Sequence, residues 1–144
     1  MVKKTICIVQ ARLGSKRFPN KILEKILDKT LIEILLYRLS KSKTIEKIIV
    51  ATTDNKDDDT LAQFIGKIGF DVFRGSEKNV LDRIYCAAQH FEASTVVRIT
   101  ADCPLIDPSL VDKVVDLFYD KNVNYACNTN PPTFPDGLDV EVFD

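Results

Sequence analysis

The sequence is poor in the residues on which metal-binding and disulfide-bonded proteins rely. It has one histidine and four cysteines in 144 residues. No two cysteines form a C-x-x-C pair, which argues against a zinc site, and their wide spacing gives no sign of a disulfide framework. His90 falls near the end of a predicted helix, where histidine is usually a solvated cation beside the helix dipole. We expect a non-catalytic His90 and reduced thiols at Cys7, Cys86, Cys103 and Cys127.

An excess of one charge and long apolar runs are also missing. Twenty basic residues face 21 acidic ones, for a net charge of -1. Such a balance provides no global field toward nucleic acid or membrane, and only Phe18 offers an aromatic ring beside the basic residues. No apolar run approaches the ~18 residues of a membrane span, and no signal-peptide core is present. We expect a cytoplasmic protein that binds neither nucleic acid nor membrane.

What the chain does have is a regular alternation of strands and helices, in a sequence that is 45% hydrophobic. This pattern predicts the α/β class, with a mainly parallel sheet flanked by helices. We expect one domain over residues 1–144, and because a strand ends the chain we expect it to be truncated at the C-terminus. The predicted strands cover 6–10, 47–51, 71–74, 95–100, 125–128 and 138–143, and the predicted helices begin near 31, 59, 80 and 108.

Three details of this prediction bear on the site. Thr52 to Asn55 reads as a polar turn after the second strand. Asp57 to Asp59 reads as an acidic first helical turn, which we favour over a metal site. The third helix is expected to bury one apolar face, made of Val80, Leu81, Ile84, Tyr85, Ala88 and Phe91.

The stretch from Ile6 to Lys21 carries the strongest functional signal. A short apolar run passes directly into a basic, glycine-containing loop, and ligands of open α/β sheets lie beyond the carboxyl ends of strands. The loop therefore indicates a polyanionic ligand, most simply a nucleoside triphosphate, although an ordinary solvated turn would have the same composition. Its polar and basic residues are Arg12, Gly14, Ser15, Lys16, Arg17 and Lys21.

Nucleotidyl transfer needs cations on a triphosphate and a carboxylate that holds Mg²⁺. Arg12 and Lys21 supply cations, and the backbone amides from Leu13 to Ser15 would cradle phosphate. Asp102 leaves the end of the fourth strand and would hold the metal, because Mg²⁺ prefers oxygen ligands. A further pair of carboxylates, Asp139 and Glu141, lies on the last strand. Neither a Walker A loop nor a G-x-G-x-x-G fingerprint is present, which weakens ATPase and dehydrogenase interpretations.

Four segments resemble motifs of the cytidylyltransferase family of sugar-activating enzymes, in the same order. The likeness is to the spore coat polysaccharide biosynthesis protein F branch, which is similar to CMP-KDO and CMP-sialic acid synthetases. The segments are ARLGSKRFPNK (11–21), FRGSEKNVLDR (73–83), RITADCPLID (98–107) and PDGLDVEVF (135–143).

The resemblance implies a nucleotide-diphospho-sugar transferase (GT-A-like, Rossmann-like) fold, Mg²⁺, CTP as donor and a small sugar as acceptor, in polysaccharide biosynthesis. It also implies a possible homodimer in the full-length form, and a second metal-binding aspartate beyond Asp144. The same fold using another nucleotide, and a non-catalytic nucleotide-binding domain, stay open as alternatives. By position, the resemblance assigns nucleotide binding to Ala11, Arg12, Leu13, Gly14, Ser15, Arg17, Lys21, Arg74 and Ser76. It assigns catalysis to Arg12, Lys21 and Asp102, and metal binding to Asp102. It assigns sugar binding to Asn128, Asp139 and Glu141.

Overall fold

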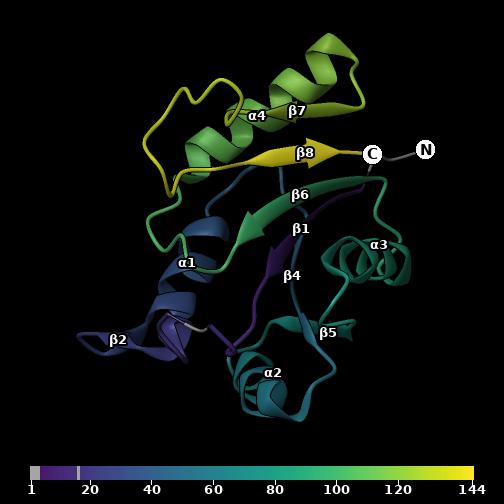
Figure 1. Ribbon diagram of the computed structural model, residues 1–144. Coiled ribbons are helices and arrows are strands. Elements are labelled where there is room, and N and C mark those ends of the chain that lie inside the picture. Colours follow the sequence, from purple (N-terminus) through teal and green to yellow (C-terminus); the bar gives the residue numbers. More distant parts are fainter. Residues whose placement is uncertain (1–3, 16) are drawn as a thin grey trace.

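A computed structural model describes residues 4–15 and 17–144. Within these residues, one six-stranded sheet runs through the molecule, with β1 near its centre (Figure 1). A two-stranded ribbon of β2 (Lys25–Ile26) and β3 (Lys29–Thr30) lies apart from it. Across the large sheet the order is β5 (Asp71–Gly75), β4 (Lys47–Thr53), β1 (Thr5–Gln10), β6 (Thr95–Thr100), β8 (Glu141–Phe143) and β7 (Tyr125–Cys127).

Four neighbouring strands, β5, β4, β1 and β6, are parallel, as predicted. In β1, Ile6 and Ile8 face one side of the sheet while Cys7 and Val9 face the other, and all four side chains are fully buried. A parallel strand covered on both faces needs this continuous apolar sequence. Since the four strands run the same way, the residues that follow them meet at one edge of the sheet.

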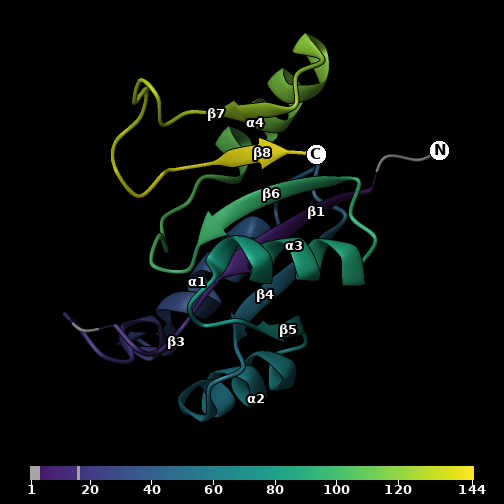
Figure 2. The ribbon, with the colours of Figure 1, turned by 45° about the vertical axis from the view of Figure 1, so that its right-hand side comes forward.

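Helices cover both faces of the parallel strands (Figures 1 and 2). The larger core lies under α1, α2 and α4, and the smaller one lies under α3. Among the described residues, none of the helices has both the length and the apolar composition to cross a bilayer. The helical segments are η1 (Lys21–Leu23), α1 (Leu31–Leu39), η2 (Lys56–Asp58), α2 (Asp59–Lys67), α3 (Val80–His90) and α4 (Pro108–Lys121).

Side-chain caps begin four of these helical segments, α1, η2, α3 and α4. At α1, the Thr30 hydroxyl accepts from the Glu33 amide and the Glu33 carboxylate accepts from the Thr30 amide, which forms a capping box. The backbone hydrogen bond from Thr30 is the main reason why the pKa of Glu33 is lowered. At α4, Asp107 accepts from the Ser109 amide and Pro108 is the first helical residue, as the sequence predicts.

The predicted turn at Thr52 and Thr53 is wrong. Both residues continue β4, pair with Arg74 and Gly75 of β5, and are fully buried. Threonine is a good strand residue because it is β-branched, and a buried hydroxyl is tolerated when it finds an acceptor. The Thr53 hydroxyl finds one in the Asp58 carboxylate. The turn therefore begins two residues later than predicted, at Asp54.

The predicted apolar face of α3 is also partly wrong. Leu81 and Tyr85 are 75% and 57% exposed, whereas Ile84 and Ala87 are buried against the sheet. Leu81 and Tyr85 are separated by one helical turn, so they form a stripe of their own beside the buried one. Arg83 is buried in their place, with 1% of its surface exposed.

The last two strands differ from the rest of the sheet. β8 is antiparallel to both β6 and β7, and both strands are shorter than predicted, since Asn128 and the segment 138–140 lie outside them. α4 packs against one face of this pair, while α3 packs on β1, β4 and β5 (Figure 2). On the other face of the pair, the Tyr125 and Phe143 rings are stacked with centroids 6.5 Å apart.

Candidate functional site

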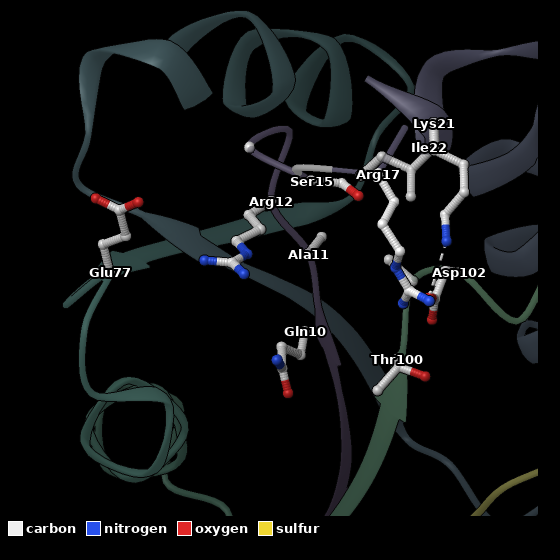
Figure 3. Close-up of a pocket in the computed structure, with 12 residues that line it drawn as sticks. Gln10, Ala11, Arg12, Ser15, Arg17, Lys21, Ile22, Glu77, Thr100 and Asp102 are labelled. Carbon is white, nitrogen blue, oxygen red and sulfur yellow. Dashed lines mark hydrogen bonds and ion pairs between the residues drawn. The ribbon is translucent and has the colours of Figure 1, made fainter. Parts of the chain in front are cut away.

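A pocket of about 500 Å³ lies at the carboxyl edge of the parallel strands (Figure 3). The residues that line it come from the end of β1 and its loop, from the turn that precedes α3, and from the end of β6 and the residues after it. This agrees with the expectation that a ligand binds where parallel strands end. The lining residues are Gln10, Ala11, Arg12, Gly14, Ser15, Arg17, Lys21, Ile22, Glu77, Thr100, Ala101 and Asp102.

The basic loop is held on the core by one apolar residue, Leu13. Its side chain is 7% exposed, and its amide donates to the buried Asp58 carboxylate at 2.7 Å. The Leu13 carbonyl accepts from the amides of Ser15 and Asn20, at 2.8 and 3.1 Å. The loop thus points the Leu13 side chain inward and leaves Arg12 and Arg17 exposed at the pocket.

These contacts narrow the predicted phosphate cradle. Two of the three amides proposed for it, those of Leu13 and Ser15, already donate within the protein. Among the described residues, no acceptor is found for the Gly14 amide, and Gly14 and Ser15 line the pocket while Leu13 does not. The phosphate cradle stays a prediction, and the Gly14 amide and the cationic side chains are the groups left for it. Lys16, which also belongs to the predicted loop, lies outside the described residues.

Asp58 is a residue that the sequence pattern did not single out. It is 3% exposed and accepts from the Thr53 hydroxyl and the Leu13 amide, so it joins β4 to the basic loop. Its neighbours fit the predicted helix terminus, because η2 (Lys56–Asp58) overlaps this acidic run and α2 begins at Asp59. Across the described residues, no group of three histidine, cysteine or acidic side chains is placed to hold a metal ion.

Opposite charges meet at one end of the pocket. Lys21 Nζ lies 3.0 Å from Asp102 Oδ2, with the two side chains 32% and 49% exposed. Partial burial raises the pKa of Asp102, but the hydrogen bond and charge of Lys21 outweigh it, and the pKa is lowered overall. Asp102 is therefore ionised at neutral pH. The predicted phosphate cation and the predicted metal ligand lie in direct contact.

Glu77 lies at the other end of the pocket, beyond Arg12 (Figure 3). Its carboxylate accepts from Asn55 Nδ2 at 3.1 Å. Arg17, Lys21 and Asp102 are grouped at the opposite end, with Thr100 beside Asp102 and Gln10 between the two ends (Figure 3). The pocket thus has charged side chains at both ends and the neutral side chain of Gln10 between them.

The predicted base-contacting residues lie outside the pocket lining. Arg74 donates to the carbonyls of Thr53 and Asn55 and forms an ion pair with Asp59 at 2.6 Å. The Ser76 hydroxyl accepts from the Asn79 amide. These bonds brace the β4–β5 edge and the start of α3, and the base-contacting role of Arg74 and Ser76 stays a prediction.

The predicted sugar-side residues also lie away from the lining. Asn128 is 8% exposed, and its amide donates to the Leu138 carbonyl and accepts from the Val140 amide, at 2.8 and 2.9 Å. Glu141 is bonded to Arg98 and Tyr125 on the sheet, and Asp139 is exposed. Asn128 clearly has a structural task, and the sugar-binding role of all three residues stays a prediction.

Arg83 supports the segment that carries the pocket residue Glu77. Its Nη1 donates to the Ser76 carbonyl at 2.6 Å, while Nε and Nη2 find no acceptor among the described residues. Burial, and then the charge of Arg12, lower the pKa of Arg83. A Cβ on Gly75 would lie 3.1 Å from the Arg83 Cγ, so the absence of a side chain at Gly75 permits this close packing.

The sequence analysis did not name several of the lining residues as site residues. Ile22, Glu77 and Thr100 line the pocket, and so does Gln10, the last residue of β1. A signal existed for Gln10 and Thr100, because each is a polar residue that ends a predicted buried strand. No pattern in the sequence pointed to Asp58, since its partner Leu13 is 45 residues away.

The fold and the pocket together define an α/β protein with a nucleotide-diphospho-sugar transferase fold. The cytidylyltransferase family model matches residues 6–136. A solved structure, a cytidylyltransferase from Leptospira borgpetersenii, superposes with a TM-score of 0.92 at 38% identity, covering 97% of this chain and 60% of that one. The chain belongs to the cytidylyltransferase family.

Two relatives known by sequence add to this result. An uncharacterized protein of Methanocaldococcus jannaschii is 46% identical over 140 residues, which are 97% of this chain and 56% of the relative. The spore coat polysaccharide biosynthesis protein SpsF of Bacillus subtilis is 37% identical over 129 residues, or 87% of this chain and 54% of the relative. The chain thus spans about half the length of these curated relatives.

Proposed function

We propose that this chain forms the nucleotide-binding core of an enzyme that activates a sugar by transferring CMP from CTP, with release of pyrophosphate. The observation that carries the proposal is the pocket itself, which is lined by Arg12, Arg17, Lys21 and the Asp102 carboxylate at the end of the parallel strands, with Lys21 in contact with Asp102. Family membership supports the choice of reaction class.

The cationic side chains have the clearest task in this reaction. A sugar hydroxyl gives up its proton to solvent and attacks the α-phosphorus of CTP, the bond to the bridging oxygen breaks, and pyrophosphate leaves with the electron pair. Negative charge grows on the leaving group, so Arg12 and Lys21 would stabilise the transition state. Arg17 and the Gly14 amide would help hold the triphosphate before the reaction.

The pocket also suits Mg²⁺. Mg²⁺ is usually held by one or two carboxylates together with substrate phosphates and water, and Asp102 offers an ionised carboxylate at the pocket. When bound, the ion would offset phosphate charge. Lys21 supports this assignment, because its charge favours the ionised form that a metal ligand needs.

The remaining parts of the proposal concern the whole enzyme. The acceptor is a small sugar destined for a surface polysaccharide, the reaction takes place in the cytoplasm, and a homodimer is possible in the longer form. The name of the Bacillus subtilis relative, a spore coat polysaccharide biosynthesis protein, supports the polysaccharide role.

A thermal-shift panel with CTP, UTP, ATP and GTP, each with and without Mg²⁺, tests the proposal. A ligand that binds only the native state raises the melting temperature, because it adds about 2.7 kcal/mol to the free energy of unfolding at a concentration a hundred times its Kd. We expect the largest shift with CTP and Mg²⁺, and we expect Asp102→Asn to remove the effect of Mg²⁺.

Other outcomes would decide between the alternatives. A larger shift with another nucleotide would overturn the assignment of CTP as the donor, and the pocket would still be assigned as a nucleotide-binding site. Binding of CTP without pyrophosphate release by the full-length enzyme, in the presence of candidate sugars, would favour a non-catalytic nucleotide-binding domain. An Asp102→Asn protein that keeps its Mg²⁺ response would remove Asp102 as the metal ligand.

A further inference from the structure

The carboxamide of Gln10 is held in one orientation by Arg98. Arg98 Nη2 and Nε lie 2.8 and 3.3 Å from Gln10 Oε1. A guanidinium has only hydrogen-bond donors, so the group of Gln10 that faces it must be the carbonyl oxygen and not the NH₂. The Gln10 NH₂ is then turned away from Arg98, and within the described chain no residue accepts from it. Gln10 therefore offers two N–H donors at the pocket.

Arg98 is itself fixed on the sheet. It pairs across the strands with Glu141 and forms an ion pair with its carboxylate. The other Glu141 oxygen accepts from the Tyr125 hydroxyl at 2.7 Å. Burial and this hydrogen bond raise the pKa of Tyr125, so the phenol stays a donor at physiological pH. A continuous row of hydrogen bonds thus runs from β7 through β8 and β6 to Gln10 on β1.

This row gives Gln10 the rigidity that a recognition residue needs. Arg98 and Glu141 are only 30% and 26% exposed, and each uses its planar group for two partners. A side chain whose rotamer is locked by neighbours binds its ligand with less loss of entropy. The orientation of the Gln10 amide is therefore fixed before any ligand arrives.

The position of Gln10 indicates which part of a ligand it contacts. Phosphates are drawn to Arg12, Arg17 and Lys21, which are on the loop. Gln10 is neutral and lies in the centre of the pocket, between Arg17, Lys21 and Asp102 on one side and Arg12 and Glu77 on the other (Figure 3). The carboxylate of Glu77 would repel phosphate at the far end. An uncharged, oxygen-bearing group suits this central region better than a phosphate does.

We propose that Gln10 is a specificity-determining residue that donates a hydrogen bond to an oxygen of the nucleoside part of the bound nucleotide, and that Arg98 is a positioning residue acting through Gln10. The inference rests on the proposed nucleotide-binding function and adds to it a residue that reads the nucleoside. The oxygen belongs to the base or to the ribose.

The test is a calorimetric titration of the protein with CTP and with inorganic triphosphate, both in the presence of Mg²⁺. In Gln10→Met, which keeps the side-chain length and removes the donor, we expect the affinity for CTP to fall about threefold to tenfold. The affinity for inorganic triphosphate should change less than about twofold, because the cations on the loop are untouched. Titration with 2′-deoxy-CTP separates ribose from base, since a smaller loss in Gln10→Met with this ligand assigns the oxygen to the ribose.

Arg98→Gln tests the positioning role. Glutamine at 98 can face Gln10 with either its oxygen or its NH₂, so the Gln10 amide is no longer held in one orientation. We expect a loss of CTP affinity smaller than in Gln10→Met, and no additional loss when both changes are combined. Additive losses would show that Arg98 does not act through Gln10.

Lys47→Gln serves as a control, because Lys47 pairs with Asp71 at the opposite end of β4 and should not affect either ligand. The inference is overturned if Gln10→Met binds CTP as tightly as the unchanged protein does, or if it loses CTP and triphosphate equally. If the unchanged protein binds another nucleotide more tightly, only the cytidylyl assignment fails, and the same comparison is made with that nucleotide. If it binds no nucleotide better than triphosphate, both proposals fail.

Discussion

The two halves of the sheet differ in how their faces are covered and in whether they reach the pocket. The parallel half, from β5 to β6, is covered by helices on both faces and ends in the pocket. The antiparallel pair, β8 and β7, has α4 on one face, and its other face carries Glu141 and the stacked rings of Tyr125 and Phe143. Burial on both faces makes the first half stable, whereas the second half can use polar side chains because one face stays accessible.

This difference shows which half of the sheet determines the shape of the pocket. In the parallel half, the pocket loop is anchored by buried contacts such as that between Asp58 and Leu13. In the antiparallel half, Asn128 anchors the chain that leads from β7 to β8, and no contact of its side chain reaches the pocket. Changes in the two halves should therefore separate stability from ligand binding.

The largest effect is expected for Asp58→Ala. Removing the carboxylate leaves the buried Leu13 amide and Thr53 hydroxyl without their acceptor, so we expect a loss of about 3 kcal/mol of unfolding free energy. Binding of inorganic triphosphate should weaken as well, because the loop loses its anchor. Urea unfolding and calorimetric titration measure the two effects.

Asp57→Ala is the matched control for this prediction. Asp57 is the exposed neighbour in the same acidic run, so its removal should cost less than about 0.5 kcal/mol. Equal costs for Asp57→Ala and Asp58→Ala would mean that the acidic run acts only through the helix terminus. The hydrogen bond between Asp58 and Leu13 would then add no stability beyond that of the helix terminus.

A smaller effect is expected for Asn128→Ala in the antiparallel half. The change removes an acceptor for the Val140 amide and a donor to the Leu138 carbonyl, for about 2 kcal/mol of unfolding free energy. Nucleotide affinity should stay within about twofold of the unchanged protein. Asn124→Ala, an exposed asparagine nearby, should change neither quantity. A large loss of affinity in Asn128→Ala would show that the antiparallel pair controls the pocket through Glu141.

The same comparison explains what the sequence could predict. Ile8 and its neighbours form a continuous apolar run, which is a local pattern, so the presence of the parallel strands and the position of the loop after β1 were predicted correctly, although β4 runs two residues further than predicted. Asp102 was placed at the pocket because it directly follows a strand. Local periodicity could not reveal that Leu81 would be exposed, because an apolar side chain beside a buried stripe looks like part of it.

Contacts between distant residues explain the rest. Gln10 and Arg98 are 88 residues apart, and Asp58 and Leu13 are 45 apart. Each pair depends on strand order and register, which no single segment encodes. The basic loop was recognisable because its cations are adjacent in the sequence. The side chains that orient and anchor the pocket were not recognisable, because their partners come from other strands.

The smallest effect is expected outside both halves of the sheet, at Asp112 on α4. Partial burial raises the pKa of Asp112. Its carboxylate accepts hydrogen bonds from the hydroxyls of Ser42 and Thr44 and from the amides of Lys43 and Thr44, and these lower the pKa by more than burial raises it. The pKa of Asp112 is therefore lowered overall. A lowered pKa means that the carboxylate stabilises the fold above the unfolded value of about 3.9, and that this contribution is lost as the pH falls through the folded pKa.

Asp112→Asn separates this contribution from other acid effects. Asparagine keeps one acceptor oxygen and does not titrate in this range, so we expect a loss of about 1 kcal/mol at pH 7 that shrinks as the pH falls below 4. Urea unfolding from pH 7 to pH 3 measures it, with Asp116→Asn, an exposed residue one turn along α4, as the control. A constant difference across this pH range would mean that the hydrogen bonds of Asp112 do not depend on its charge. Nucleotide affinity at pH 7 should be the same in both variants, because Asp112 ties α4 to residues 42–44 and not to the pocket loop.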